Sequence, residues 1–143
     1  MAKDTFHGAV RRALEKEGWT ITADPLEISV GTVDLKIDLA AQQLHEGLLA
    51  AERENEKIAV EIKSFVGGSE ISEWHTALGQ FVNYRDALSE QDPERVLYLA
   101  VPNDTYESFF QEAFIQRSVQ RYQVSLIVYR PTQQEIALWN PLS

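Results

Sequence analysis

Apolar and polar positions follow two different periods along the chain, and the longer period predicts helices. Apolar side chains recur every three or four positions over residues 4–17, which is typical of an amphipathic helix. The same spacing returns over residues 70–89, directly after Ser69, whose hydroxyl can cap the first turn of a helix. A third helix is expected to begin at residues 102–104 and to continue to about Tyr122.

The shorter period, in which every second position is apolar, predicts strands. It is clearest over residues 33–39, while residues 96–101 are apolar without interruption and predict a central strand covered on both faces. A hairpin is expected from residues 48–52 and 57–65, around a polar turn. Further strands are expected at residues 19–22, 26–30, 124–129 and 136–139.

The predicted elements follow one another roughly in the order αββββαβαβ. Helices that interrupt a series of strands indicate an α/β (α+β) fold with a mixed central β-sheet flanked by helices. No repeat, linker or low-complexity stretch breaks the pattern, so residues 1–143 are expected to form one domain.

Cysteine is absent from the 143 residues. Its absence excludes disulfides, thiolate zinc sites and cysteine nucleophiles, and it is consistent with a reducing compartment. No apolar run approaches the roughly 18 residues of a membrane span, and the first residues lack the apolar core of a signal peptide. We therefore expect a cytoplasmic protein with no membrane partner.

The charge of the chain limits its partners. There are 13 Lys and Arg residues and 22 Asp and Glu residues, which gives a formal net charge of −9. Because basic side chains supply most of the sequence-independent affinity for nucleic acids, this charge argues against a protein that grips long DNA unaided. A DNA-binding role would need bound cations, a local basic surface or a partner protein.

Several common catalytic motifs are missing, including the G-x-S-x-G elbow, the glycine-rich phosphate loop and H-E-x-x-H. His7, His45 and His75 are widely separated and are expected to be structural or exposed. The pattern that remains is Glu61-Ile62-Lys63, within a predicted core strand. Residues two apart on a strand project from the same face, so this carboxylate and this amine are neighbours.

Asp38, near the end of the predicted strand over residues 33–39, is the acidic residue that can join this pair. Two carboxylates and a lysine on neighbouring strands are what an Mg²⁺ site for phosphodiester cleavage requires, because hard oxygen atoms bind the cation and an amine stands near the attacking water. Spacing alone leaves alternatives open. Asp34-Leu35-Lys36 has the same pattern, and a solvated strand face or a cross-strand ion pair accounts for either one.

Two polar residues of the predicted helix over residues 70–89 are further candidates. Gln80 and Tyr84 are four positions apart and therefore share one side of the helix. Gln80 could donate a hydrogen bond to a phosphate that Tyr84 orients. In the alternative interpretation, Tyr84 packs at the rim of the core and Gln80 is solvated.

Four segments spread over residues 31–110 resemble the XisH family, the cyanobacterial factors associated with excision of the fdxN DNA element. They are GTVDLKIDLAA, EKIAVEIKSF, SEWHTALGQFVNYRDAL and RVLYLAVPNDTYESFF. That family is in turn similar to the PD-(D/E)XK restriction-endonuclease-like fold, which carries an acidic-x-Lys pair on its third core strand.

The resemblance implies a role for each residue near that strand. Asp38, Glu61 and the carbonyl of Ile62 would bind Mg²⁺ or Mn²⁺. Lys63 would position the attacking water or help to deprotonate it. The resemblance favours this pair over Asp34-Leu35-Lys36, which is assigned to a structural strand.

The resemblance also extends to the helices and to the spacing of the motif. Gln80 and Tyr84 would hold the scissile phosphate, like the Gln-x-x-x-Tyr of some branches of the superfamily. Residues 40–47 would be an insertion between the two acidic positions. Related resolvases carry a glutamate on the first helix, and in that region this chain offers Asp4, His7 and Glu15.

The function implied is control of the excision of a DNA element, built on a metal-dependent endonuclease-like site that hydrolyses DNA phosphodiesters. One alternative is a catalytically silent accessory protein that acts through an XisI-like partner or a site-specific recombinase. Another is a toxin-like nuclease that such a partner inhibits. DNA is the expected substrate, and the chain alone is expected to bind it weakly. A homodimer would allow both strands of a DNA duplex to be contacted.

Overall fold

The fold is built on a mixed six-stranded sheet, seen in a computed structural model that describes residues 2–45 and 54–142. Its strand order is β1-β4-β5-β6-β7-β8, and β2 and β3 form a separate hairpin. The strands are β1 (Thr20–Ala23), β2 (Leu26–Val30), β3 (Val33–Ile37), β4 (Leu39–His45), β5 (Glu54–Ile62), β6 (Arg95–Pro102), β7 (Leu126–Arg130) and β8 (Glu135–Asn140). The expected mixed sheet flanked by helices is confirmed.

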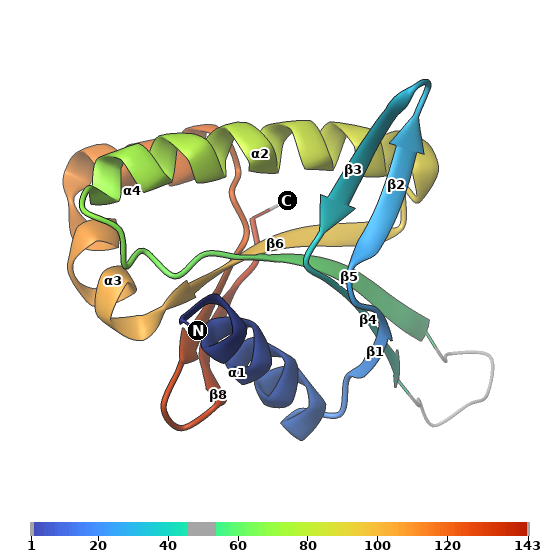
Figure 1. Cartoon of the computed structure of the whole chain (residues 1–143), viewed down its shortest axis with the longest axis horizontal. Helices are drawn as coiled ribbons and strands as arrows, with labels where there is room; N and C mark the ends of the chain where they lie inside the picture. Colours follow the sequence, from blue (N-terminus) through green and yellow to red (C-terminus); the bar gives the residue numbers. More distant parts are fainter. Residues whose placement is uncertain (1, 46–53, 143) are drawn as a thin grey trace.

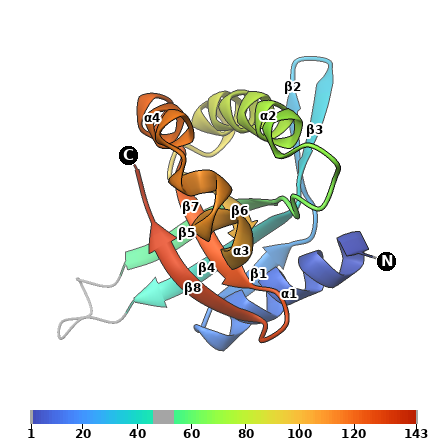
Figure 2. The ribbon, with the colours of Figure 1, turned by 90° about the vertical axis from the view of Figure 1, so that its left-hand side faces the viewer.

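Helices cover both faces of this sheet (Figure 1). The helix α1 (Ala2–Lys16) lies on one face. On the other face lie α2 (Glu70–Gln91) and α4 (Ala113–Arg121), as the rotated view in Figure 2 also shows. The hairpin of β2 and β3 packs beside α2 and projects past it (Figure 1). No helix in the described residues is both long and apolar enough to cross a membrane.

The central strand β5 separates two apolar clusters. Ile58 and Val60 pack with the residues of α1, whereas Ala59 packs with the residues of α2. Side chains alternate along a strand, so Glu61 points to the same side as Ala59, toward α2. On its two sides β5 is antiparallel to β4 and parallel to β6, which places it in the interior of the sheet.

The structure divides the strand predicted over residues 33–39 between two strands. The prediction that residues 40–47 form an insertion is wrong for residues 40–45, which belong to the strand β4. The strand β3 ends at Ile37, and β4 begins at Leu39 and lies between β1 and β5. Consecutive residues 39–41 are all fully buried, because β4 is covered on both faces. A strand buried on both faces lacks the alternation that marks a strand with one wet face.

The hairpin predicted around residues 53–56 has a different first strand. β5 begins at Glu54 and pairs with β4, and it ends at Ile62 rather than at residue 65. The predicted strand over residues 48–52 lies outside the described residues.

The helix predicted from residues 102–104 to Tyr122 is interrupted. It is divided into α3 (Asn103–Glu107), the 3-10 turn η2 (Phe109–Gln111) and α4. The buried ring of Phe110 lies at 5.4 Å from the ring of Trp74 and at 5.6 Å from that of Phe65. The turn at η2 directs the ring of Phe110 into the core beneath α2. One straight helix would not place the ring there.

Candidate functional site

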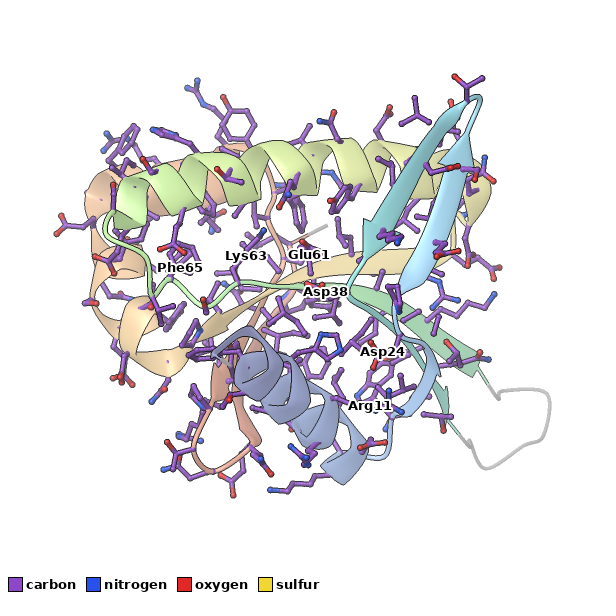
Figure 3. All side chains as sticks on the ribbon, in the orientation of Figure 1. Arg11, Asp24, Asp38, Glu61, Lys63 and Phe65 are labelled. Carbon is purple, nitrogen blue, oxygen red and sulfur yellow. The ribbon has the colours of Figure 1, made fainter. Side chains whose placement is uncertain are left out.

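Asp38 and Glu61 meet where β4 begins and β5 ends. Leu39 pairs with Val60 in antiparallel register, and continuing that register places Asp38 opposite Glu61. The backbone N–H of Asp38 donates to Oε1 of Glu61 at 3.3 Å, and the N–H of Ile62 donates to Oδ2 of Asp38 at 2.7 Å. Each carboxylate is thus held by a backbone group across the junction of β4 and β5. Figure 3 shows the labelled Asp38, Glu61 and Lys63 near one another below α2.

Lys63 follows β5 directly, and its backbone is fixed on both sides. Its N–H donates to the carbonyl of Ala100 at 3.0 Å, and the hydroxyl of Tyr129 donates to its carbonyl at 3.2 Å. Its Nζ lies 3.6 Å from Oε2 of Glu61. Tyr129 is a buried core residue, and the parallel order β5-β6-β7 brings its hydroxyl beside Lys63, a contact that no local sequence pattern indicates.

The electrostatics of Glu61 follow from its surroundings. Only 6% of the residue is exposed. Burial first, and then the neighbouring charge of Asp38, raises the pKa of Glu61 to about 7, although Lys63 and the N–H of Asp38 act in the opposite direction. The buried carboxyl of Glu61 is therefore held against a second carboxylate, that of the partly buried Asp38.

The helix α2 brings Tyr84 to these carboxylates. Burial, followed by the charges of Glu61 and Asp38, raises the pKa of the Tyr84 phenol above its ordinary value. Gln80 lies one turn earlier on the same side of the helix. Its Oε1 is buried and has no hydrogen-bond partner within residues 2–45 and 54–142. An unpaired buried amide oxygen is costly, so it indicates a place for a donor that the chain itself does not supply.

A cavity of about 330 Å³ opens beside the carboxylates. It is lined by Phe6, His7, Asp38, Ile62, Lys63, Ser64, Val66 and Glu73. Nε2 of His7 lies 2.7 Å from Oδ1 of Asp24, whose other oxygen accepts from Arg11 at 2.6 Å. Glu73, seven positions before Gln80 on α2, also lines the cavity, although it was not predicted as a site residue.

The competing acidic-x-Lys pattern lies elsewhere. Asp34 and Lys36 belong to the β2–β3 hairpin, outside the main sheet, and both are exposed. The hydroxyl of Ser29 donates to Asp34 at 2.7 Å, across the hairpin. The geometry therefore fits a structural strand at this position. His75 is exposed and lines a different pocket, between α2 and α4.

Comparison with known proteins identifies the family of the chain. The family model described as "XisH protein" matches residues 1–137. The chain belongs to the XisH family. Among curated proteins, no match was found.

Two solved structures of XisH-related proteins are similar to this chain over nearly their whole length. An XisH family protein from Nostoc punctiforme is 52% identical, with a TM-score of 0.86, and the match covers 96% of this chain and 99% of that one. An FdxN element excision controlling factor protein from Anabaena variabilis is 51% identical, with a TM-score of 0.84, and the match covers 96% and 98%.

In this XisH chain, the donor set beside the cavity fits a hard divalent cation. The side chains of Asp38 and Glu61 and the carbonyl of Ile62 are oxygen donors, and Mg²⁺ usually takes one or two protein carboxylates and completes its shell with water. No group of three or more His, Cys, Asp or Glu residues suited to a metal occurs in the described part of the chain. Any Mg²⁺ held here would therefore rest on these two carboxylates and keep several waters.

Proposed function

We propose that this XisH chain acts in the excision of a DNA element through a PD-(D/E)XK-like, Mg²⁺-dependent endonuclease site. The observation that carries the proposal is the convergence of Asp38, Glu61 and Lys63 at the adjoining ends of β4 and β5. The mixed sheet, with β5 antiparallel to β4 and parallel to β6, supports the same assignment. The role in excision is supported by the 51% identity to the FdxN element excision controlling factor protein from Anabaena variabilis.

Each residue has a chemical role in this proposal. Asp38, Glu61 and the carbonyl of Ile62 hold Mg²⁺ or Mn²⁺, which supplies positive charge to the reacting phosphate and lowers the pKa of bound water. Lys63 orients the attacking water and stabilises the charge that develops on the phosphate oxygens.

The helix α2 completes the site on the side of the substrate. Gln80 and Tyr84 share the side of the helix that approaches the carboxylates. The buried Oε1 of Gln80 has no partner among residues 2–45 and 54–142 and, as an acceptor, can take a hydrogen bond from a bound water but not from a phosphate, which only the NH2 group of the amide can bind. In the proposed complex, the amide of Gln80 donates to the scissile phosphate and Tyr84 orients that phosphate.

A second function is favoured by the net charge of −9. A chain with this charge is poorly suited to bind DNA alone, which favours an accessory factor that acts through an XisI-like protein or a site-specific recombinase. In that case the carboxylate site does not carry out the chemistry of excision.

The test is cleavage of labelled duplex, flap, single-stranded and four-way-junction DNA in Mg²⁺ or Mn²⁺. We expect wild type to cleave at least one of them and Lys63→Ala to be slower by about 100-fold or more. The matched control is Lys36→Ala, which removes the lysine of the other acidic-x-Lys pattern from an exposed strand and should keep full activity.

Two outcomes contradict the nuclease proposal. One is a folded wild-type protein that cleaves none of the substrates, which would transfer support to the accessory function. The other is equal cleavage by wild type and Lys63→Ala, which would assign the activity to another site or to a contaminant.

A further inference from the structure

An apolar groove of about 420 Å³ runs between α2 and α4, and it shares no lining residue with the cavity of the candidate site. Trp74 and Leu78 line it from α2, and Phe114 and Ser118 line it from α4. Trp74 itself is buried, so the groove adjoins the core. The groove is a separate surface, and the nuclease proposal does not use it.

Beside its buried side, α2 carries apolar residues that the described part of the chain covers only in part. Its inward side buries Trp74, Ala77, Phe81, Ala87 and Leu88 against the sheet. On another side, Ile71, Leu78 and Val82 follow one another at helical spacing, and Ile71 and Val82 are 39% and 38% exposed. These residues adjoin the buried side and widen the apolar surface of α2 beyond the part that the sheet covers.

The helix α4 extends this apolar surface across the groove. Phe114 is 58% exposed, and Tyr122, at the end of α4, is 42% exposed. Phe114, Ser118 and Arg121 follow one another at steps of four and three and so share one side of α4. Contiguous apolar patches that are rimmed by polar residues mark interaction sites on soluble proteins.

The charge of the groove selects the kind of partner. Arg117 and Arg121 both line it and are exposed, and neither has an ion-pair partner in residues 2–45 and 54–142. They stand four positions apart, on one turn of α4. In a chain of net charge −9, two free guanidinium groups beside one apolar groove are a local excess of positive charge. The complementary ligand is apolar and acidic.

We propose that the α2–α4 groove docks an acidic amphipathic helix of a partner protein. Apolar side chains of that helix, at helical spacing, contact Leu78 and Phe114, and its Asp or Glu residues pair with Arg117 and Arg121. Nucleic acid is disfavoured because the groove is mainly apolar and offers only two arginines for phosphates. A second copy of the chain is disfavoured because two molecules of charge −9 repel each other.

The test uses three fluorescent helical peptides with the same apolar stripe, whose flanking positions are all Glu, all Gln or all Lys. Binding to the full chain is measured by anisotropy. We expect the Glu peptide to bind at least about tenfold more tightly than the Lys peptide, because the Lys side chains would face Arg117 and Arg121 with like charge. Phe114→Ser, and Arg117→Ala combined with Arg121→Ala, should each weaken binding of the Glu peptide about tenfold. Val33→Ser, at an exposed apolar residue of the hairpin, is the matched control and should change nothing.

Several results overturn the proposal. Equal affinity for the three peptides, or no binding by any at millimolar concentration, removes the acidic helix as the ligand. Sedimentation that shows a dimer, lost in Phe114→Ser, assigns the groove to a second copy. Displacement of the Glu peptide by single-stranded DNA, together with loss of DNA binding in the Arg117→Ala, Arg121→Ala variant, assigns the groove to nucleic acid. Because Phe114, Arg117 and Arg121 are exposed, their variants should fold, and circular dichroism checks this.

Discussion

At the scale of single residues, the buried carboxyl of Glu61 links the candidate site to stability. Its pKa in the folded chain is raised from 4.5 to about 7, so the folded state binds this proton more tightly than the unfolded state does. The protonated carboxyl of Glu61 therefore stabilises the folded state at low pH, and this contribution is lost as the pH rises from 4.5 to about 7. The loss from Glu61 alone approaches about 3 kcal/mol, since one pKa unit corresponds to about 1.4 kcal/mol.

Glu61→Gln should accordingly stabilise the chain at alkaline pH. The amide is neutral at every pH and keeps an oxygen that can accept from the N–H of Asp38. We expect the free energy of unfolding at pH 8, measured by urea denaturation in a chelator, to rise by about 1–3 kcal/mol. At pH 4 the difference should vanish. Glu94→Gln, at an exposed position, is the control, and a Glu61→Gln variant that is less stable than wild type at pH 8 would refute the argument.

At the scale of elements, α2 depends on its first turn. Ser69 caps this helix: its Oγ accepts from the N–H of Ser72 at 3.2 Å, and Gln80 and Tyr84 are carried farther along the same helix. We expect Ser69→Ala to lower the free energy of unfolding by about 1 kcal/mol, because one N–H of the first turn loses its acceptor. Ser72→Ala, which keeps the cap, should have little effect. Equal denaturation midpoints for wild type and Ser69→Ala would contradict this prediction.

The elements also show what the sequence could predict. The helix over residues 70–89 was predicted because apolar spacing and a capping serine agree on one answer, and α2 extends it by two residues. The strand β4 was missed because it is covered on both faces and so carries no alternation, and α4 was merged with α3 because the turn at η2 depends on where Phe110 packs.

The candidate site, too, could be predicted from the sequence only in part. The pairs Glu61-x-Lys63 and Asp34-x-Lys36 are equivalent in spacing, so only the position of their strands distinguishes them. One pair lies at the end of an interior strand, and the other lies on a hairpin outside the main sheet. His7 and Tyr129 reach the site from elements distant in sequence, so their distance to Asp38 and Lys63 cannot be read from a local pattern.

At the scale of the whole molecule, the net charge of −9 sets the conditions for contact with DNA. If the carboxylate site holds a divalent cation, that cation supplies charge that the chain lacks. We expect no detectable binding of duplex DNA in a chelator, weak binding in Ca²⁺, and loss of that binding in Glu61→Ala. Fluorescence anisotropy at constant ionic strength measures this. Tight binding that is independent of cations would contradict the prediction.

The two backbone bonds that hold Lys63 have a consequence for how the protein is made. Ala100 and Tyr129 both come after Lys63 in the chain, and Tyr129 lies 66 residues farther on. A chain still emerging from the ribosome thus already contains Asp38, Glu61 and Lys63 but lacks the partners that fix the lysine backbone. The site is completed only when β7 joins the sheet, so the order of synthesis delays the assembled site until the residues of β7 have been made.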